Sequence, residues 1–433
     1  MGAGQGPGPW AGALTLLLLI AGLAVRSRRT EVPAWSIMAL ASLVTVASGL
    51  TPLDSLASVI DMDVVLFLIG MFSIVAVAEG SGLLGFLAYS IAHGLKSTYR
   101  ALAAFALVMG LLSAIAMNDT MALAGPPIAY SFSRAIGVDP KLASILLAFS
   151  ITIGSVATPI GNPQNLLIAT GSRMPAPFVS FAKCLLAPTL VSLVVTAVLV
   201  ARAYGVRDVR IEGRLREAEH RIVCRRDAYI AALALASVMA ALVVDDVLAL
   251  MGLPHVEHRG FIPFVAAAGI YVLVSSPREA LRRVDWGAVV FFITMFITMH
   301  GVWRSGVLGP LLSLLMPCRD EGPANYLRIV ASSLLLSQLL SNVPFTKLFL
   351  DYMKDLGYGP QDSGSWLSLA MASTIAGNLT VLGAASNIII IEVLESKFNS
   401  TITFFEFLKV GSLVTAANLL CYTPFLLALG PWG

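Results

Sequence analysis

Four short polar sequences interrupt apolar stretches of this chain, and they mark where binding chemistry could occur. Two of them are Asn118-Asp119-Thr120 and Ser341-Asn342-Val343-Pro344. The other two run from Thr158 to Asn165 and from Gly377 to Asn387. Asn, Asp, Ser and Thr favour helix N-caps, and Pro favours the first helical turn. Each sequence therefore predicts a helix that stops and starts again.

A helix that restarts inside a membrane exposes free N–H groups and the positive end of its dipole, which attract anions. The carbonyl groups released at the break can bind a cation, and Asn side chains both donate and accept hydrogen bonds. The alternative is that these residues only kink helices and bond them together. Four breaks in two matching pairs favour a binding site. The predicted substrate-binding residues are Asn118, Asp119, Thr120, Asn162, Asn165, Ser341, Asn342 and Asn387, and the predicted coupling-ion residues are Asp119, Thr158, Gly161, Asn378, Thr380 and Gly383.

Asp119 is the charge that we single out first. A carboxylate at bilayer depth is costly and usually functional, so it either carries a coupling proton or ligates a coupling cation. The alternative is a helix-capping aspartate bonded to backbone N–H groups. Lys347 either pairs with Asp119, replaces a coupling cation, or extends to the membrane surface. Glu392 is either a second proton site or an interfacial anchor.

The composition predicts a membrane protein. Of the 433 residues, 57% are hydrophobic and 12% are charged, whereas soluble domains carry about 25% charged residues. A net charge of +3 does not indicate nucleic-acid binding. The four cysteines match no zinc or disulfide framework. The sequence also holds no zinc-protease, serine-hydrolase or P-loop motif, so we expect no enzyme and no cofactor beyond a coupling sodium ion or proton.

The apolar blocks predict ten spans and two hairpins in a multi-pass protein of the inner (plasma) membrane. Arginines follow the first block, precede the block at 286 and fill the segment 205–227, which places all three clusters in the cytoplasm and the N-terminus outside. The hairpins lie at 100–135 and 326–357. The spans lie near 9–25, 34–52, 63–80, 142–170, 182–204, 228–252, 261–276, 286–305, 366–395 and 405–429.

The two halves of the chain resemble each other. The sequence from Phe67 to Phe72 matches that from Phe291 to Phe296, 224 positions on, and Asn118 falls on Asn342 at the same separation. The stretch that begins at Thr158 matches the one at Thr380, 222 positions on. We therefore predict a first repeat at 1–204, a cytoplasmic linker at 205–227 and a second repeat at 228–433. Five spans per repeat invert the second one, an arrangement typical of secondary transporters with a site at the repeat interface.

The expected fold is thus an all-α polytopic membrane protein of two inverted five-span repeats, each with a re-entrant helical hairpin and an unwound span. In these features the chain resembles the ion transporter superfamily, which contains arsenite permeases, NhaD-type sodium/proton antiporters and divalent-anion/sodium symporters. The resemblance is carried by Met117 to Thr120, Thr158 to Asn165, Ser341 to Pro344 and Gly377 to Glu392. It implies a homodimer in which transport subdomains move against a scaffold as an elevator.

The hairpin tips separate this chain from the carboxylate branch of that superfamily, in which each tip carries Ser-Asn-Thr. The tips here are Met117-Asn118-Asp119 and Ser341-Asn342-Val343, which keep both asparagines and lose both threonines. The pattern is closer to the arsenite-permease and NhaD-like branches. We expect ion-coupled transport of a small anion or oxyanion. The alternatives are arsenite or antimonite efflux, sodium/proton exchange and, in another class, an ion channel.

The inverted repeat predicts that the segment 205–227 and the loop 253–258 lie on opposite sides of the membrane. Single cysteines introduced by Gly213→Cys and His255→Cys should react with an impermeant thiol reagent from the cytoplasmic and the outer side, respectively. Reaction of both cysteines from one side would contradict the inverted topology.

Overall fold

The fold is known from a computed structural model, which describes residues 8–26, 32–92, 97–210, 222–315, 323–398 and 400–428. Residues 211–221 of the predicted linker, Arg28, Arg29 and Cys318 lie outside the described residues. Where the chain is described, it is helical and its only β-pairing is one isolated bridge.

The helices follow the order of the predicted spans. In the first half they are α1 (Pro9–Arg26), α2 (Ala34–Ala47), α3 (Leu56–Val59), α4 (Met62–Gly80), α5 (Leu83–Ala92), α6 (Thr98–Ala116), α7 (Asn118–Ile136), α8 (Pro140–Ser155), α9 (Pro163–Gly171) and α10 (Pro177–Ala203). In the second half they are α11 (Arg225–Leu250), α12 (Phe261–Leu273), α13 (Pro277–Arg283), α14 (Trp286–Arg304), α15 (Gly309–Leu315), α16 (Pro323–Leu340), α17 (Asn342–Asp355), α18 (Ser363–Ile375), α19 (Ala385–Phe398) and α20 (Phe404–Ala428). Short 3₁₀ turns η1 (Leu53–Ser55), η3 (Ala376–Asn378) and η4 (Val381–Gly383) complete the described structure.

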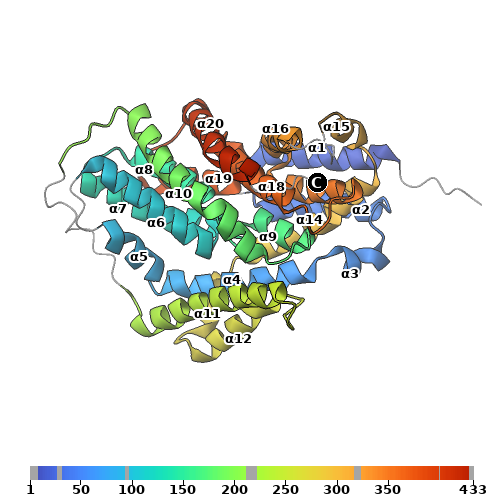
Figure 1. Cartoon of the computed structure of the whole chain (residues 1–433), viewed down its shortest axis with the longest axis horizontal. Coiled ribbons are helices and arrows are strands. Elements are labelled where there is room, and N and C mark those ends of the chain that lie inside the picture. Colours follow the sequence, from blue (N-terminus) through green and yellow to red (C-terminus); the bar gives the residue numbers. More distant parts are fainter. Residues whose placement is uncertain are drawn as a thin grey trace, which may run out of the picture.

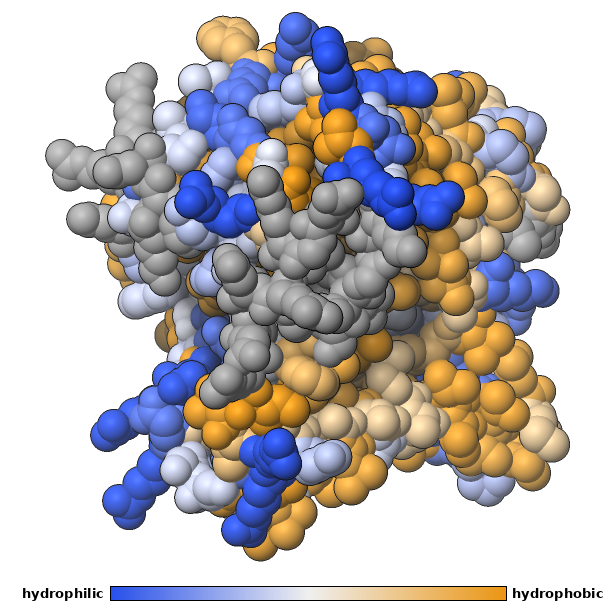
Figure 2. Space-filling model, turned by 90° about the vertical axis from the view of Figure 1, so that its left-hand side faces the viewer, coloured by the Kyte–Doolittle hydropathy of each residue, from blue (hydrophilic) through white to orange (hydrophobic). Residues whose placement is uncertain are grey.

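Seven of the described helices are long and apolar enough to cross a membrane, namely α1, α4, α6, α10, α11, α14 and α20. The all-α polytopic class is therefore confirmed. One of the seven, α6, belongs to a predicted hairpin. The first helix of that hairpin is therefore longer than a short re-entrant hairpin requires. The sequence prediction omitted α5, α13 and α15, which are short connecting helices. Much of the surface seen in Figure 2 is hydrophobic, and hydrophilic side chains gather on parts of this end of the molecule.

Both predicted hairpins turn at a residue with a positive φ angle. Helices α6 and α7 meet at Met117 (φ 69°), and α16 and α17 meet at Ser341 (φ 66°), 224 positions on. Such a conformation costs a residue with a side chain about 1–3 kcal/mol and persists only where the surroundings impose it. At the first tip the next residue, Asn118, donates its backbone N–H to the carbonyl oxygen of Gly161, 2.9 Å away. The two tips thus share one unusual backbone geometry.

Both predicted broken spans also share one local structure. Between α8 and α9, and again between α18 and α19, the chain leaves the helix and releases carbonyl groups that lipid cannot satisfy. In each break one asparagine side chain donates to two of those carbonyl oxygens, and the two sets of bonds lie 222 positions apart. The pairs are Asn165 to Ser155 and Thr158 (3.0 Å each) and Asn387 to Gly377 and Thr380 (2.7 and 3.2 Å).

The packing between the halves is reciprocal. Helix α2 packs on α14 while its counterpart α12 packs on α4, and α1 packs on α14 while α11 packs on α4. In the same way α7 packs on α19 while α17 packs on α9. Two similar units that are related by an approximate two-fold axis make reciprocal contacts of this kind. The boundaries 1–204, 205–227 and 228–433, and the inversion, stay predictions.

The helices divide into two sets by their contacts. The framework helices are α1, α2, α4, α11, α12 and α14, and the carrier helices are α6 to α10 and α16 to α20. Contacts within each set are more extensive than contacts between the two sets. The contacts between the sets join α10 to α11, α14 to α17, α4 to α9 and α1 to α16. In Figure 1 the framework helices α4, α11 and α12 lie along the lower edge of the molecule, below α9 and α10.

The start of the predicted linker is tied to the first hairpin. The carboxylate of Asp208 accepts from the hydroxyl of Ser97 (2.6 Å) and the backbone N–H of Tyr99 (3.1 Å). These two donors, the hydroxyl first, hold the pKa of the exposed Asp208 carboxyl below its ordinary value. The linker therefore enters the described structure beside the open end of the α6–α7 hairpin.

Two adjacent carboxylates of α11 join the framework to the start of α10. Asp246 accepts from the backbone N–H groups of Phe178 (2.6 Å) and Val179 (3.1 Å), at the N-terminus of α10. Arg259 pairs with Asp246 at 3.1 Å and with Asp245 at 3.0 Å, and both carboxylates are buried. Asp246 therefore caps α10, and both aspartates bind Arg259.

Asp246→Ala should destabilise the protein, because it leaves two helix N–H groups and part of the Arg259 charge unpaired. Loss of one partner of a buried ion pair typically costs about 3–5 kcal/mol. The control is Glu279→Ala, which removes the exposed pair with Arg283 and should cost at most about 0.5 kcal/mol. Thermal unfolding of both variants in detergent measures the difference, and equal melting temperatures would contradict this role of Asp246.

Candidate substrate cavity at the hairpin tips

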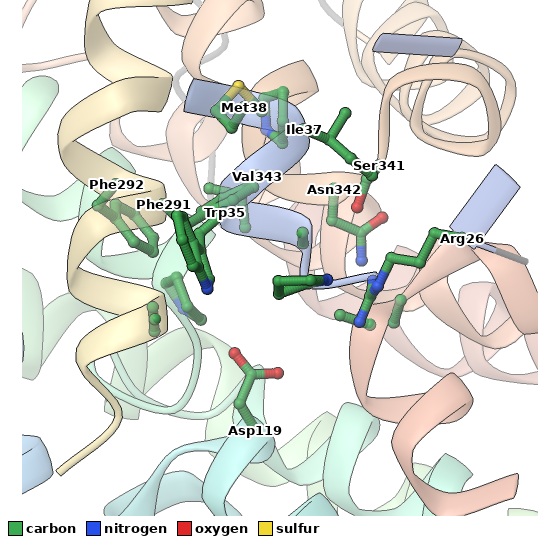
Figure 3. A pocket seen from close by; sticks show the side chains of 18 of the residues that line it. Arg26, Trp35, Ile37, Met38, Asp119, Phe291, Phe292, Ser341, Asn342 and Val343 are labelled. Carbon is green, nitrogen blue, oxygen red and sulfur yellow. The ribbon is translucent and has the colours of Figure 1, made fainter. Parts of the chain in front are cut away.

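The two hairpin tips line one cavity of about 260 Å³. The α6–α7 tip contributes Asn118 and Asp119, and the α16–α17 tip contributes Ser341 and Asn342. Figure 3 shows these tips on different sides of the cavity, with the Asp119 side chain pointing into it and Asn342 lying on the side of Arg26. Residues 224 positions apart are therefore brought to a common space.

Several helices begin at this cavity. Its walls include the first residues of α7, α9, α17 and α19 or their immediate neighbours, and also the starts of α2 and α14. Each helix N-terminus carries roughly half a positive charge on its free N–H groups. Their convergence contributes positive charge to the cavity in addition to that of Arg26.

Among the described residues, the charged side chains that line the cavity are Arg26, Asp119 and Asp285. Asp285 caps α14 by accepting from the backbone N–H of Ala288 at 2.9 Å. Asp119 makes no hydrogen bond or ion pair within the part of the chain that the structure describes, and the start of α7 has no side-chain cap. The capping alternative for Asp119 is thus wrong in this conformation, and its carboxylate is left for the contents of the cavity.

One wall of the cavity is apolar and was not expected from the sequence. Trp35, Ile37 and Met38 of α2 line the cavity together with Phe291 and Phe292 of α14, and Figure 3 shows Ile37 beside Ser341 of the second tip. Nothing in their spacing distinguishes them from lipid-facing residues of ordinary spans. Arg26 and Asp285 were also not predicted from the sequence as cavity residues.

Four asparagine side chains at or behind the tips hold unpaired oxygen atoms. The Oδ1 atoms of Asn118, Asn342, Asn378 and Asn387 are buried and have no hydrogen-bond partner among the described residues. Both amide atoms of Asn378 are unpaired. A buried amide oxygen without a partner is costly. Neutral oxygens of this kind are ligands for a hard cation, or acceptors for a donor that enters with the substrate.

The remaining predicted binding residues do not line the cavity. Asn162 is the N-cap of α9, and its side chain bonds to the backbone N–H of Asn165, to Ser155 Oγ and to Thr374 Oγ1 at 2.8, 2.8 and 3.1 Å. Asn165 donates to carbonyl oxygens within the break, and its Oδ1 atom accepts from Thr374 Oγ1 of α18 at 3.3 Å. Asn387 and Thr120 also lie outside the cavity walls. These asparagines hold the broken spans in shape one layer behind the cavity.

Apart from Asp119 at the first hairpin tip, the predicted coupling-ion residues lie in the two breaks. The hydroxyl of Thr158 donates to the carbonyl oxygen of Ala114 (2.5 Å), and that of Thr380 donates to Gln338 Oε1 (2.7 Å). These acceptors occupy equivalent positions near the ends of α6 and α16. Gly161 and Gly383 are also equivalent, and an added Cβ at Gly161 would lie 2.2 Å from the Ser155 carbonyl oxygen. Only glycine allows this close approach of the chain to itself.

Lys347 does not pair with Asp119, which corrects one of the expected alternatives. Its ammonium group binds Asp351 one turn further along α17, and both side chains are about one-fifth exposed. Glu392 is exposed on α19 and does not line the cavity. No group of histidine, cysteine and carboxylate side chains that could hold a metal ion occurs within the described residues.

Comparison with known proteins identifies the family. The sequence profile of the citrate transporter family (CitMHS) matches residues 16–375. The chain belongs to this family. The expected resemblance to the ion transporter superfamily is therefore confirmed, and so is the expectation that the protein is no enzyme. The protein is a multi-pass membrane transporter.

Similar proteins occur in bacteria, in a plant and in a mammal, and two of the three named here carry transporter names. An uncharacterized transporter of Mycobacterium tuberculosis is 26% identical over 372 residues, covering 83% of this chain and 84% of the relative. The silicon efflux transporter LSI3 of Oryza sativa subsp. japonica is 26% identical over 340 residues, covering 66% and 69%. The P protein of Mus musculus is 24% identical over 448 residues, covering 84% of this chain and 53% of that protein.

Solved structures share the fold. The YdaH transporter of Alcanivorax borkumensis matches with a TM-score of 0.56 at 14% identity, over 86% of this chain and 87% of its own. MtrF of Neisseria gonorrhoeae matches with a TM-score of 0.58 at 11% identity, over 98% and 96%. At these identities the likeness shows a common membrane-transporter architecture and nothing about the transported species.

The site geometry predicts different effects for two asparagines. Asn162→Ala removes a helix cap and two buried side-chain bonds, so it should lower the unfolding free energy by about 1–3 kcal/mol. Asn342→Ala removes an unpaired oxygen and should cost less, although it lies at the cavity. Thermal unfolding of both variants in detergent tests this, and a larger loss for Asn342→Ala would contradict the assignment of Asn162 to the supporting layer.

Proposed function

We propose that this transporter is an ion-coupled secondary carrier for a small anion or oxyanion, moved by an elevator mechanism. The observation that carries the proposal is the meeting of two hairpin tips, Asn118-Asp119 and Ser341-Asn342, at one cavity into which helices from both halves point their N-termini. Sites of this kind lie at the repeat interface of secondary transporters. Arg26 adds a full positive charge to the same cavity.

The cavity supports a small substrate of low net charge. An ionised Asp119 would repel an anion held at the tips, because two unit charges 4 Å apart interact by about 4 kcal/mol at an effective dielectric constant of 20. A di- or tricarboxylate carries that penalty more than once, and neither tip offers the threonine hydroxyl of the carboxylate branch. We therefore propose a neutral species, or an anion that moves with a proton or sodium ion at Asp119.

The names of the family and of its relatives do not identify the substrate of this protein. The family is named for citrate, whereas one relative is named for silicon efflux. The missing threonines and the unpaired Asp119 carboxylate support an oxyanion or its protonated form over citrate. Arsenite or antimonite efflux and sodium/proton exchange are neighbouring functions of the same site, and the coupling experiment below distinguishes them.

An elevator is supported by the two sets of helices. The tips and both breaks belong to the carrier helices, whereas Arg26, Trp35 and Phe291 belong to the framework helices. The cavity therefore lies between the two sets, which touch each other at few places. The cavity-lining ends of α1, α2 and α14 are those that the arginine clusters place in the cytoplasm, so we assign this conformation to the cytoplasm-facing state. A homodimer formed through the framework helices is part of the proposal.

Asp119→Asn should leave substrate binding intact and abolish the dependence of uptake on an ion gradient, because the amide neither carries the proton nor charge-balances a cation. A thermal-shift screen of anions and oxyanions, with citrate and succinate included, first identifies the substrate on purified protein. Uptake into proteoliposomes is then measured under imposed sodium or proton gradients. Asp227→Asn, which changes a carboxylate outside the cavity, is the control.

Three outcomes would contradict the proposal. Undiminished gradient-driven uptake by the Asp119→Asn variant would refute the coupling role of this carboxylate. Tight binding of succinate or citrate by the native protein would refute the substrate class. Downhill flux that never accumulates substrate against its gradient would favour a channel.

A further inference from the structure

A row of buried, unpaired polar side chains lies behind the second hairpin tip, away from the substrate cavity. Ser333 and Ser337 stand one turn apart on α16, both fully buried, and neither hydroxyl has a hydrogen-bond partner among the described residues. A buried hydroxyl without a partner is destabilising, because it has lost its hydrogen bonds to water. Two such groups in succession point to something that they bind.

Helix α20, which like α16 packs on the turn η3, and helix α10, which packs on α20, contribute further unpaired polar atoms. Thr415 Oγ1, Asn418 Nδ2 and Ser192 Oγ are buried and lack partners within the described chain. The other amide atom of Asn418 accepts from Thr196 at 3.2 Å. We call the unpaired set Ser192, Ser333, Ser337, Asn378, Thr415 and Asn418 the polar seam.

The register of α16 against α20 brings these groups to matching depths. Tyr326 on α16 bonds to Thr423 on α20 at 2.7 Å, and Ser333 and Ser337 lie on the same helix face as Tyr326. At 1.5 Å per residue, Ser333 lies about 10 Å from Tyr326, and Thr415 lies about 12 Å from Thr423. Because the two helices run in opposite directions, Ser333 and Thr415 sit at the same level.

The inner end of the polar seam reaches the hairpin tip. A Cβ on Gly411 of α20 would lie 2.2 Å from the carbonyl oxygen of Asn378, so α20 packs directly on this break. A Cβ on Gly377 would lie 2.9 Å from the side-chain nitrogen of Asn342. Asn378, whose amide is wholly unpaired, therefore lies directly behind the tip that lines the cavity.

The outer end lies where α16 and α18 begin. There Asn325 donates to Ser365 Oγ at 3.3 Å, while its Oδ1 atom is buried and unpaired. The polar groups thus continue from the start of α16 toward its end at Leu340.

Most of these polar positions are apolar in the first repeat, although Ser192 belongs to that repeat and the counterpart of Asn418 is Thr196. At the repeat separations of 224 and 222, the counterparts of Asn325, Ser333, Asn378 and Thr415 are Ala101, Met109, Val156 and Leu193. The counterpart of Ser337 is Ser113, whose hydroxyl donates to the Ile151 carbonyl oxygen at 2.7 Å. Packing of the common fold therefore does not require the polar groups, since the equivalent helices pack with apolar ones.

We propose that the polar seam is a hydrated path by which sodium passes between the end of the molecule at α16 and α18 and the break at Asn378. The proposal rests on the coupled transport proposed above. Hydroxyl and amide oxygens are neutral ligands suited to a hard monovalent cation. The C-terminal ends of α16 and α18 carry negative dipole ends at the inner end of the seam, which favour a cation and oppose an anionic substrate. Cation and substrate then enter by separate routes.

Thiol labelling tests the path without any transport assay. In a background with all four native cysteines replaced by alanine, Ser333→Cys and Ser337→Cys are compared with Met109→Cys, the equivalent position of the first repeat. The probe is 2-aminoethyl methanethiosulfonate, a small cationic reagent, applied to reconstituted protein in sodium or in choline chloride. Cysteines 333 and 337 should react at least tenfold faster than cysteine 109, and sodium should slow the reaction at 337.

Each outcome decides one part of the proposal. Equal rates at 333 and 109, in variants that keep their melting temperature, would overturn the hydrated path. Fast labelling that sodium does not slow would overturn its use by this cation. If labelling behaves as expected while the Asp119→Asn variant keeps gradient-driven uptake, the result supports the hydrated path. The same result would refute the coupling role of Asp119.

Discussion

The absence of water from the bilayer core is the constraint on which the rest of this structure depends. Every backbone N–H and C=O group there needs a partner from the protein, so a broken span survives only if side chains replace the lost helix bonds. Asn165 and Asn387 do this in the two breaks, each bonding two released carbonyl groups. The breaks free N–H groups at the starts of α9 and α19, and the hairpin turns do the same at α7 and α17. By bonding the released carbonyl groups, the supporting asparagines therefore allow these helix N-termini to face a cavity inside the membrane.

Two-fold repetition explains how such a costly arrangement arises in one chain. The same turn geometry at Met117 and Ser341, and the same asparagine bonds 222 positions apart, build two half-sites that need only meet. The reciprocal packing of α7 on α19 and α17 on α9 brings them together. A site made in this way has its ligand groups on the carrier helices and its opposite wall on the framework helices.

Much of this was predictable because it depends on local sequence. Apolar runs and arginine clusters indicate the spans, and Asn, Pro and Gly mark the breaks, since few other residues are tolerated there. The cavity wall was not predictable, because Trp35 and Phe291 face the cavity only through the crossing of α2 with α14. Within the breaks, sequence could not separate Asn342, whose oxygen is unpaired at the cavity, from Asn162, which caps a helix behind it. Residue type is the same in both cases, and only the neighbours differ.

The positions at which the two halves differ are the first places to look for function. Asp119 lies at the first tip and Val343 at the equivalent position of the second, so the cavity holds a carboxylate from one repeat only. Asn378 and Ser333 lie in the second repeat, where the first has Val156 and Met109. A fold that needs both halves to pack alike has no structural reason to place the carboxylate in one half and most of the unpaired polar atoms in the other. A protein whose two halves were chemically identical would present the same groups to both sides of the membrane, so these positions are where the two sides of this protein differ.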